Sequence, residues 1–142
     1  MPVEPIPDRY QTVTPYLIIK GIEEFIEFLI KVFSAKLTER LTGPDGSTIH
    51  AEVRIGDSLI MIGEQPDGSE SRPGVLYVYT EDVDVLYQKS LDHGCKSISA
   101  PQDQFYGDRS AGFEDPFGVQ WWVATHIEDV SPEEMAKRAA GH

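Results

Sequence analysis

A pattern of helix- and strand-forming segments occurs twice in this 142-residue chain, at a constant spacing of 61 residues. In each copy, apolar residues at three- and four-residue intervals predict an amphipathic helix, and short runs of β-branched and aromatic residues predict strands. A constant spacing across a helix and several strands indicates a tandem β-α-β-β-β unit. The corresponding residues are Ile22 and Val83, Phe25 and Leu86, Ile26 and Tyr87, Tyr16 and Tyr77, Leu37 and Ile98, and Met61 and Trp122.

The repeat predicts an α+β fold, in which tandem β-α-β-β-β units form a curved, half-barrel-like mixed sheet with the helices outside. One helix is expected from Ile22 to Phe33, and the other begins at Val83 and ends before Gly94. Each unit leaves one sheet face without a helix, and the other unit, a second chain or a ligand must cover it. The expected strands are 11–19, 37–41, 48–55, 58–63, 75–80, 96–100, 109–114 and 119–125.

Proline, glycine and capping residues divide the chain into five segments. Three prolines among the first seven residues predict an extended arm, because proline fixes φ and donates no backbone hydrogen bond. Several Gly and Pro residues between 63 and 74 predict a linker. Ser131, Pro132 and Glu134 form a capping signature for a short helix. The segments are an extended N-terminal arm (1–10), a first unit (11–65), a linker (66–74), a second unit (75–126) and a C-terminal tail with a short helix (127–142).

The charge balance restricts the partners that this chain is expected to bind. The formal net charge is −12, and no cluster of Lys and Arg provides the basic surface that nucleic acid or an anionic membrane requires. The first residues contain no basic region followed by an apolar core, so no secretory signal is expected. The single cysteine, Cys95, permits no internal disulfide. We therefore expect a cytoplasmic protein that binds neither nucleic acid nor membrane.

Strand parity predicts which side chains face away from the helices, because successive residues of a strand point to opposite faces. The residues of 48–55 expected under a helix are Ile49, Ala51, Val53 and Ile55. Those expected on the opposite face are Thr48, His50, Glu52 and Arg54. Parity on the other strands, combined with the repeat spacing, gives the candidate ligand-binding residues. They are Tyr16, His50, Glu52, Tyr77, Tyr79, Arg109, Phe113, Gln120 and Trp122.

Three of these candidates have open alternatives. Arg109 could bind a carboxylate or phosphate of a ligand, or it could fix its own loop through an internal ion pair. His50 and Glu52 could form a general-base pair, contribute two metal ligands, or serve only as polar residues on a sheet face. No catalytic residue is assigned.

Several short motifs, in this order and spacing, resemble the vicinal oxygen chelate superfamily, and most of all its PhnB-like branch. This superfamily includes glyoxalase I, bleomycin-resistance proteins and extradiol dioxygenases, and the resemblance implies the duplicated fold expected above. The motifs cover nearly all of the chain after residue 10. They are Thr14–Leu17, Ile26–Phe28, His50–Ser58, Tyr106–Arg109, Asp115–Trp121 and Ala124–Glu134.

The resemblance also implies where a metal would bind. Members that use a metal place their ligands at positions that correspond to Thr14, Met61, Val75 and Trp122. A catalytic metal site draws on imidazole, carboxylate or thiolate ligands, and these four side chains provide none. Gln11 could shift into register, but one weak ligand would not hold a metal. We therefore expect neither a metal nor another cofactor.

Together, these observations predict a metal-independent small-molecule-binding protein of the glyoxalase/bleomycin-resistance type, of unknown activity. One alternative is a metal-dependent lyase, isomerase or dioxygenase with shifted ligands. Another is a resistance protein that sequesters a drug without converting it. Because each unit leaves sheet edges and one face to be covered, a homodimer is expected.

Overall fold

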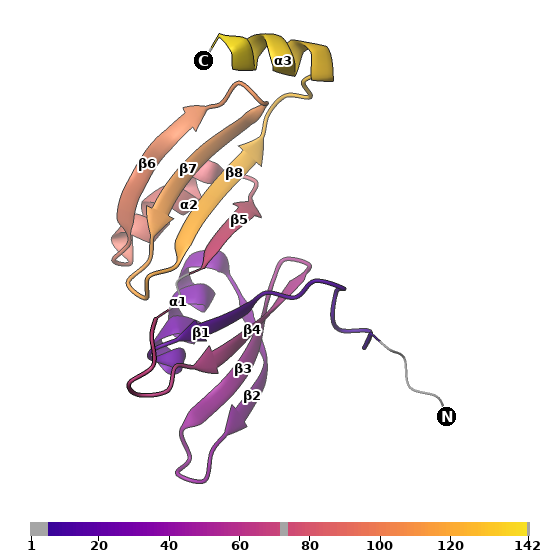
Figure 1. The fold of residues 1–142 in the computed structure, drawn as a ribbon. Coiled ribbons are helices and arrows are strands. Elements are labelled where there is room, and N and C mark those ends of the chain that lie inside the picture. The colour runs from indigo at the N-terminus through magenta and orange to yellow at the C-terminus, as the bar shows by residue number, and fades with distance from the viewer. Residues whose placement is uncertain (1–5, 72–73, 142) are drawn as a thin grey trace. The chain divides into compact units, whose positions relative to one another are not determined.

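The computed structural model describes residues 6–71 and 74–141. The chain divides into two compact units, with the boundary between residues 73 and 74, and each unit is described by itself. Each contains one four-stranded sheet with one helix packed against it, and the second carries an additional C-terminal helix (Figure 1). Part of the predicted arm (residues 1–5) and part of the predicted linker (72–73) lie outside the described residues.

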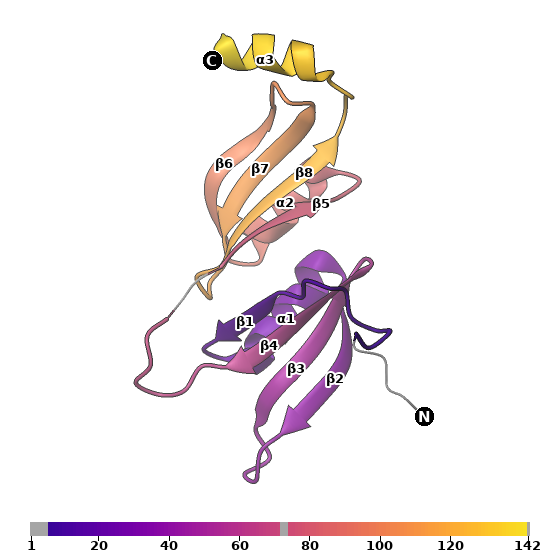
Figure 2. The ribbon, with the colours of Figure 1, turned by 45° about the vertical axis from the view of Figure 1, so that its right-hand side comes forward.

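The first unit follows the predicted β-α-β-β-β order. Its sheet has the strand order β1-β4-β3-β2, in which β1 runs parallel to β4 and the other pairs are antiparallel (Figure 2). The elements are β1 (Tyr16–Ile19), α1 (Ile22–Phe33), β2 (Lys36–Thr42), β3 (Thr48–Ile55) and β4 (Ser58–Glu64).

The second unit repeats this topology. Its strand order is β5-β8-β7-β6, with β5 parallel to β8 and the other pairs antiparallel. The elements are β5 (Val75–Tyr79), α2 (Val83–Asp92), β6 (Lys96–Asp103), β7 (Asp108–Glu114), β8 (Gln120–His126) and α3 (Pro132–Ala140). The predicted α+β class with two mixed sheets is confirmed; the sheets are open and form no closed barrel.

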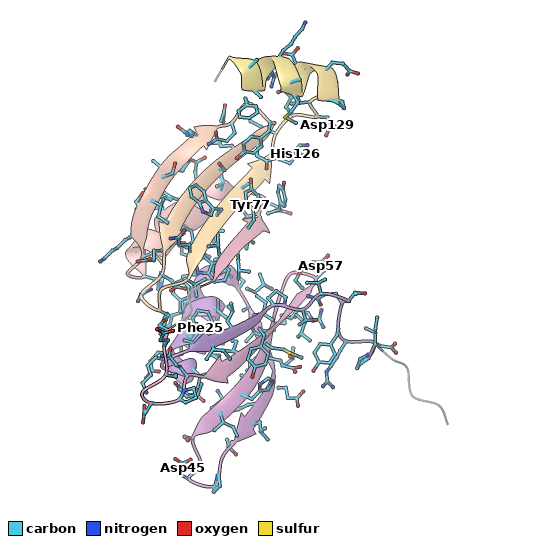
Figure 3. All side chains as sticks on the ribbon, viewed as in Figure 1. Phe25, Asp45, Asp57, Tyr77, His126 and Asp129 are labelled. Atoms are coloured by element: carbon cyan, nitrogen blue, oxygen red, sulfur yellow. The ribbon has the colours of Figure 1, made fainter. Side chains whose placement is uncertain are left out.

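The helices bury the apolar stripes that the sequence periodicity predicts. Phe25 and Leu29 of α1 are fully buried, and Ala51 and Val53 of β3 are buried in the same unit (Figure 3 labels Phe25). Burial of such side chains contributes about 1.5–3 kcal/mol each. The left-handed backbone of Gly94 (φ 92°) follows the end of α2, where a side chain would be strained.

Two strand boundaries differ from the prediction by more than one residue. β1 begins at Tyr16 rather than at residue 11, because the Thr14 hydroxyl donates to the Gln11 carbonyl and holds this segment in a local turn. β6 continues past Pro101 to Asp103. It tolerates the proline because it is an edge strand with one unpaired side.

An irregularity in β3 reverses the predicted orientation of two residues. Leu41 pairs with His50 and Thr42 pairs with Thr48, so Ile49 is an extra residue in the ladder. The prediction for this end of the strand was wrong. The Thr48 hydroxyl donates to Glu23 of α1, on the helix side, and Ile49 is 46% exposed.

Candidate functional site

The sheet face opposite the helix, here called the helix-free face, carries the candidate site in each unit. On the second unit, Tyr77 and Tyr79 of β5 lie on this face with their ring centroids 5.3 Å apart. Both hydroxyls donate to the Oδ2 of Asp108 at the start of β7, at 2.7 and 3.0 Å. Asp108 is only 4% exposed, whereas the tyrosines are 47% and 63% exposed. The result is an open aromatic surface held by a buried carboxylate.

His126, at the end of β8, completes the hydrogen bonding of this carboxylate. Its Nδ1 lies 2.9 Å from Asp108 Oδ1, and its Nε2 lies 2.8 Å from Asp129 Oδ1. Figure 3 shows His126 and Asp129 close together where β8 leads into the tail. The two carboxylates raise the pKa of His126 above its ordinary value, because both stabilise the protonated ring.

The pKa values of the other groups follow from the same contacts. Burial alone would raise the pKa of Asp108, but the hydrogen bonds from His126, Tyr77 and Tyr79 outweigh it and lower the pKa. The pKa of Tyr77 is raised, first by burial and then by its bond to Asp108. At neutral pH the tyrosines are therefore neutral hydrogen-bond donors around an ionised Asp108.

Trp122 covers part of the same face of the second unit. It pairs with Tyr77 on β5 and with Gly112 on β7, and its ring lies flat over the glycine backbone. A Cβ at position 112 would lie only 2.7–2.8 Å from three ring atoms, so only glycine leaves room for this ring. Gln120 shares the Trp122 parity on β8, as predicted.

The structure places two predicted residues, Arg109 and Phe113, on the opposite, helix-packed face. Phe113 is fully buried and pairs with Trp121, which is also fully buried. Arg109 makes a two-pronged ion pair with Asp84 of α2, at 2.9 and 3.0 Å. It also binds Asp103 of β6 at 3.0 Å. Of the two interpretations of Arg109, its contacts with Asp84 and Asp103 match the internal ion pair.

A one-residue difference between the repeats explains both errors. Glu52 pairs with Met61 in the first unit, and Gly112 pairs with Trp122 in the second. Gly112 therefore corresponds to Glu52. The spacing from Glu52 to Gly112 is one residue shorter than the spacing from Met61 to Trp122. The connection between β7 and β8 is longer than the tight turn between β3 and β4. A slip of one residue sends every side chain of the strand to the other face.

On the first unit, His50, Glu52 and Tyr16 share the helix-free face, as predicted. The Tyr16 and His50 rings have centroids 5.7 Å apart, and His50 Nε2 lies 3.5 Å from Glu52 Oε2. Glu52 pairs with Met61 on β4 and is only 3% exposed. The parity prediction thus holds for this central part of β3, beyond the irregularity at Ile49.

The segment that precedes β1 covers Glu52. The Tyr10 hydroxyl donates to Glu52 Oε2, and Arg9 Nε lies 3.6 Å from Glu52 Oε1. That distance is too long for a hydrogen bond. Within the described residues, Glu52 Oε1 is buried and has no hydrogen-bond partner. An unsatisfied buried acceptor costs about 1–3 kcal/mol, and more when it is charged.

The residues at the family's metal positions do not fit a metal. Met61 and Trp122 lack oxygen, imidazole or thiolate donors, Val75 is an exposed aliphatic residue, and the Thr14 hydroxyl is engaged with a backbone carbonyl. Across the described ranges 6–71 and 74–141, no three His, Cys, Asp or Glu residues are grouped to hold an ion. Burial raises the pKa of the Cys95 thiol to about 12, so it is protonated at neutral pH.

Sequence reasoning missed four residues of these faces: Arg9, Tyr10, Asp108 and His126. A signal existed for Asp108 and His126, which fall in or beside motifs that carried the family resemblance. Arg9 and Tyr10 fall in the segment interpreted as an extended arm. No periodicity connects them to Glu52, because their contact is made across more than forty residues of chain.

Comparison with known proteins identifies the family. The sequence model of the Glyoxalase/Bleomycin resistance protein/Dioxygenase superfamily matches residues 9–123, and this chain belongs to that superfamily. An uncharacterized protein of Mycobacterium bovis is 29% identical over 133 residues, which cover 86% of this chain and 88% of the relative.

Three solved structures show the same fold at low sequence identity. TioX from Micromonospora sp. ML1 has a TM-score of 0.70 and 21% identity, covering 82% of this chain and 99% of TioX. The PhnB protein from Bacillus cereus has a TM-score of 0.68 and 18% identity, covering 81% and 99%. The fosfomycin resistance protein FosX from Listeria monocytogenes, solved with Mn(II) and 1S,2S-dihydroxypropylphosphonic acid, has a TM-score of 0.65 and 20% identity, covering 91% and 97%.

The described helices were also compared with the requirements for a membrane span. None of those within residues 6–71 and 74–141 is both long enough and apolar enough to cross a bilayer.

Proposed function

We propose that this protein binds a small organic molecule on the helix-free faces of its sheets, without a metal ion. The observation that carries the proposal is the surface of Tyr77 and Tyr79 around Asp108. Two large aromatic side chains are half exposed there, although their hydroxyls are held by a buried carboxylate. Aromatic surfaces with a few oriented polar groups are typical of small-molecule sites.

The metal-free part of the proposal depends on the chemistry of the side chains. The four positions where the family places ligands lack a donor set, whereas FosX was solved with Mn(II). We propose that this chain has kept the fold and binds its ligand through aromatic and hydrogen-bonding contacts alone. The ligand would be planar or partly apolar, because Tyr77, Tyr79 and Trp122 present ring surfaces.

We also propose a homodimer. Tyr16, Ile18 and Leu41 of the first unit are 40–53% exposed. A second copy of the chain that covered such groups would gain apolar contact area. Analytical ultracentrifugation over a wide concentration range tests this, and a mass that stays near 15.9 kDa would contradict it.

Tryptophan fluorescence provides the binding experiment, because both tryptophans of the chain are adjacent in β8. Purified protein is titrated with a panel of aromatic compounds, with bleomycin and with fosfomycin. At least one should quench or shift the emission and raise the melting temperature. If no compound does either, the binding proposal fails.

Variants then locate the site. Tyr77→Ala should weaken binding of the selected compound by about tenfold, because an anchoring aromatic contact contributes more than about 1 kcal/mol. The matched control is Arg109→Ala, which removes an ion pair on the helix-packed face and should leave affinity unchanged. The metal content of the purified protein is measured, and the compound is recovered after incubation with it. An unaltered compound supports a binding protein, and a converted compound supports the enzyme alternative.

A further inference from the structure

The buried carboxylate of Glu52 lacks a hydrogen-bond partner on one of its two oxygens. Glu52 Oε2 accepts from the Tyr10 hydroxyl and lies 3.5 Å from His50 Nε2. Glu52 Oε1 is buried and accepts no hydrogen bond within the described part of the chain. The Glu52 side chain is only 4% exposed, so bulk solvent has almost no access to it.

The cation of the chain's own Arg9 lies close to this oxygen. Its Nε stands 3.6 Å from Glu52 Oε1, while its Nη2 donates to the Tyr10 hydroxyl at 2.8 Å. The same Nη2 lies 3.3 Å from Glu39 on β2. Arg9 is thus divided among three partners, and its side chain stays 57% exposed. The guanidinium neutralises Glu52 in part but makes no hydrogen bond to the open oxygen.

The surroundings of Glu52 suit a flat cation. The Tyr10 ring already holds the Arg9 guanidinium 4.7 Å above its centroid, which is a cation–π geometry. Tyr16 and His50 provide further ring surfaces on the same helix-free face. A net charge of −12 adds a field that attracts cations.

We propose that Glu52 anchors an amidinium, guanidinium or protonated amine of the ligand, and that Arg9 occupies this place when no ligand is bound. A free ligand is not tethered to the backbone and can turn its N–H groups toward Glu52 Oε1, which Arg9 does not reach. Ligand entry displaces Arg9, and the exposed guanidinium keeps its contact with Glu39. This inference rests on the proposed function, because it takes the helix-free faces to be where ligands bind.

The test uses benzamidine, a flat aromatic amidinium, and benzamide, its neutral counterpart of the same shape. Amide shifts of ¹⁵N-labelled full-length protein are followed during titration with each. Benzamidine should bind the wild type and shift the amides around His50, and benzamide should bind roughly tenfold more weakly or less. Equal affinity for the two compounds overturns the inference.

Three variants assign the effect. Glu52→Gln should reduce benzamidine affinity roughly tenfold or more, because it removes the buried charge that pairs with the cation. Arg9→Ala, at an exposed position where folding is not at risk, should raise affinity severalfold because the internal competitor is gone. Glu27→Gln removes one exposed carboxylate on α1 and should change affinity less than about twofold. An unchanged affinity in either Glu52→Gln or Arg9→Ala overturns the inference.

Failure of this inference can be distinguished from failure of the proposed function. If Tyr77→Ala weakens binding of the panel compounds while Glu52→Gln leaves benzamidine binding unchanged, only the proposed cation site is wrong. If neither the panel nor benzamidine binds, the proposed function itself has failed, and this inference with it.

Discussion

Each of the two units holds one buried carboxylate on its helix-free face, and the two are hydrogen-bonded very differently. Asp108 of the second unit accepts from two tyrosine hydroxyls and contacts a histidine, so both of its oxygens are occupied. Glu52 of the first unit has one occupied oxygen and one without a hydrogen-bond partner in the described structure. The same fold thus supports one complete and one incomplete polar cluster.

This difference indicates different roles. A fully hydrogen-bonded carboxylate stabilises its surroundings, and Asp108 fixes the orientation of Tyr77, Tyr79 and the start of the tail. An incompletely bonded buried carboxylate is costly, and such cost persists in proteins mainly where function requires it. We therefore expect substitution of Asp108 to reduce stability, and substitution of Glu52 to alter ligand binding with little effect on stability.

The largest effect is expected for Asp108→Ala. The variant removes a charged acceptor that serves Tyr77, Tyr79 and His126, and hydrogen bonds to charged groups contribute about 1.5–3 kcal/mol. The donors are half exposed and can turn to water, so we expect a loss of about 2–3 kcal/mol rather than a sum over all contacts. Urea unfolding followed by tryptophan fluorescence, which reports on the second unit, measures this loss.

An unchanged urea midpoint in Asp108→Ala would mean that the tyrosine–carboxylate cluster contributes nothing to stability. The comparison between the two carboxylates would then have no energetic basis. Tyr87→Phe is the control, because it removes one exposed hydroxyl bond to Ser97 outside the cluster and should have little effect.

The next-largest effect is expected at Gly112, which pairs with Trp122 in the second unit as Glu52 pairs with Met61 in the first. Gly112→Ala would place a Cβ 2.7–2.8 Å from the Trp122 ring, which must then tilt away from the sheet. Overpacking of this kind costs roughly 1–3 kcal/mol. We expect a loss near the lower end of that range, because Trp122 is only partly buried and can move.

A tilted Trp122 ring should also shift the tryptophan emission toward that of an exposed indole. Ser110→Ala, on the same face of β7, leaves the ring in place and serves as the control. An unchanged emission in Gly112→Ala would show that Trp122 does not lie against the strand.

A smaller, pH-dependent effect is expected from His126. Its pKa is raised in the folded state, so its contribution is fully present below its ordinary value of 6.5 and is lost as the pH rises through the folded value. The difference in melting temperature between wild type and His126→Gln should therefore be largest below the ordinary pKa of 6.5 and shrink as the pH rises above it. Asp108 stays ionised throughout this window, because its pKa is lowered below 3.8. A difference that grows with rising pH would contradict the assignment.

Most of the fold could be predicted from the sequence, because it follows from local periodicity repeated at one spacing. The apolar stripe of α1 and the alternation along β8 depend only on neighbours in sequence, and both predictions are confirmed. The parity prediction failed where a single residue was inserted or lost. Ile49 is an extra residue within β3, and the longer β7–β8 connection moved Arg109 and Phe113 to the other face. Parity carries no information about such insertions.

The polar clusters could be predicted only in part. Tyr77, His50 and Glu52 were correctly assigned to helix-free faces because they lie on regular strands. Their partners are Tyr10, in the irregular segment before β1, and Asp108, the first residue of β7. No pattern in the sequence indicates which strand residue either of them will meet. The difference between a complete and an incomplete cluster therefore required the structure.

The smallest expected effect, and the sharpest test of the comparison, is the stability of Glu52→Gln. The amide keeps an oxygen that accepts from Tyr10, and it removes a buried charge whose second oxygen has no donor. Replacement of a poorly paired buried charge by a neutral group of similar shape is often neutral or stabilising. We expect the free energy of unfolding to change by less than about 0.5 kcal/mol, or to rise.

The same exchange in the second unit, Asp108→Asn, should cost more than about 1 kcal/mol, because it weakens three hydrogen bonds to a charged acceptor. Urea unfolding followed by far-UV circular dichroism measures both variants on one scale. If Glu52→Gln loses as much stability as Asp108→Asn, then Arg9 and Tyr10 compensate the Glu52 charge as fully as the tyrosines and His126 compensate Asp108. The two carboxylates would then be equivalent, and no free oxygen would remain for a ligand cation.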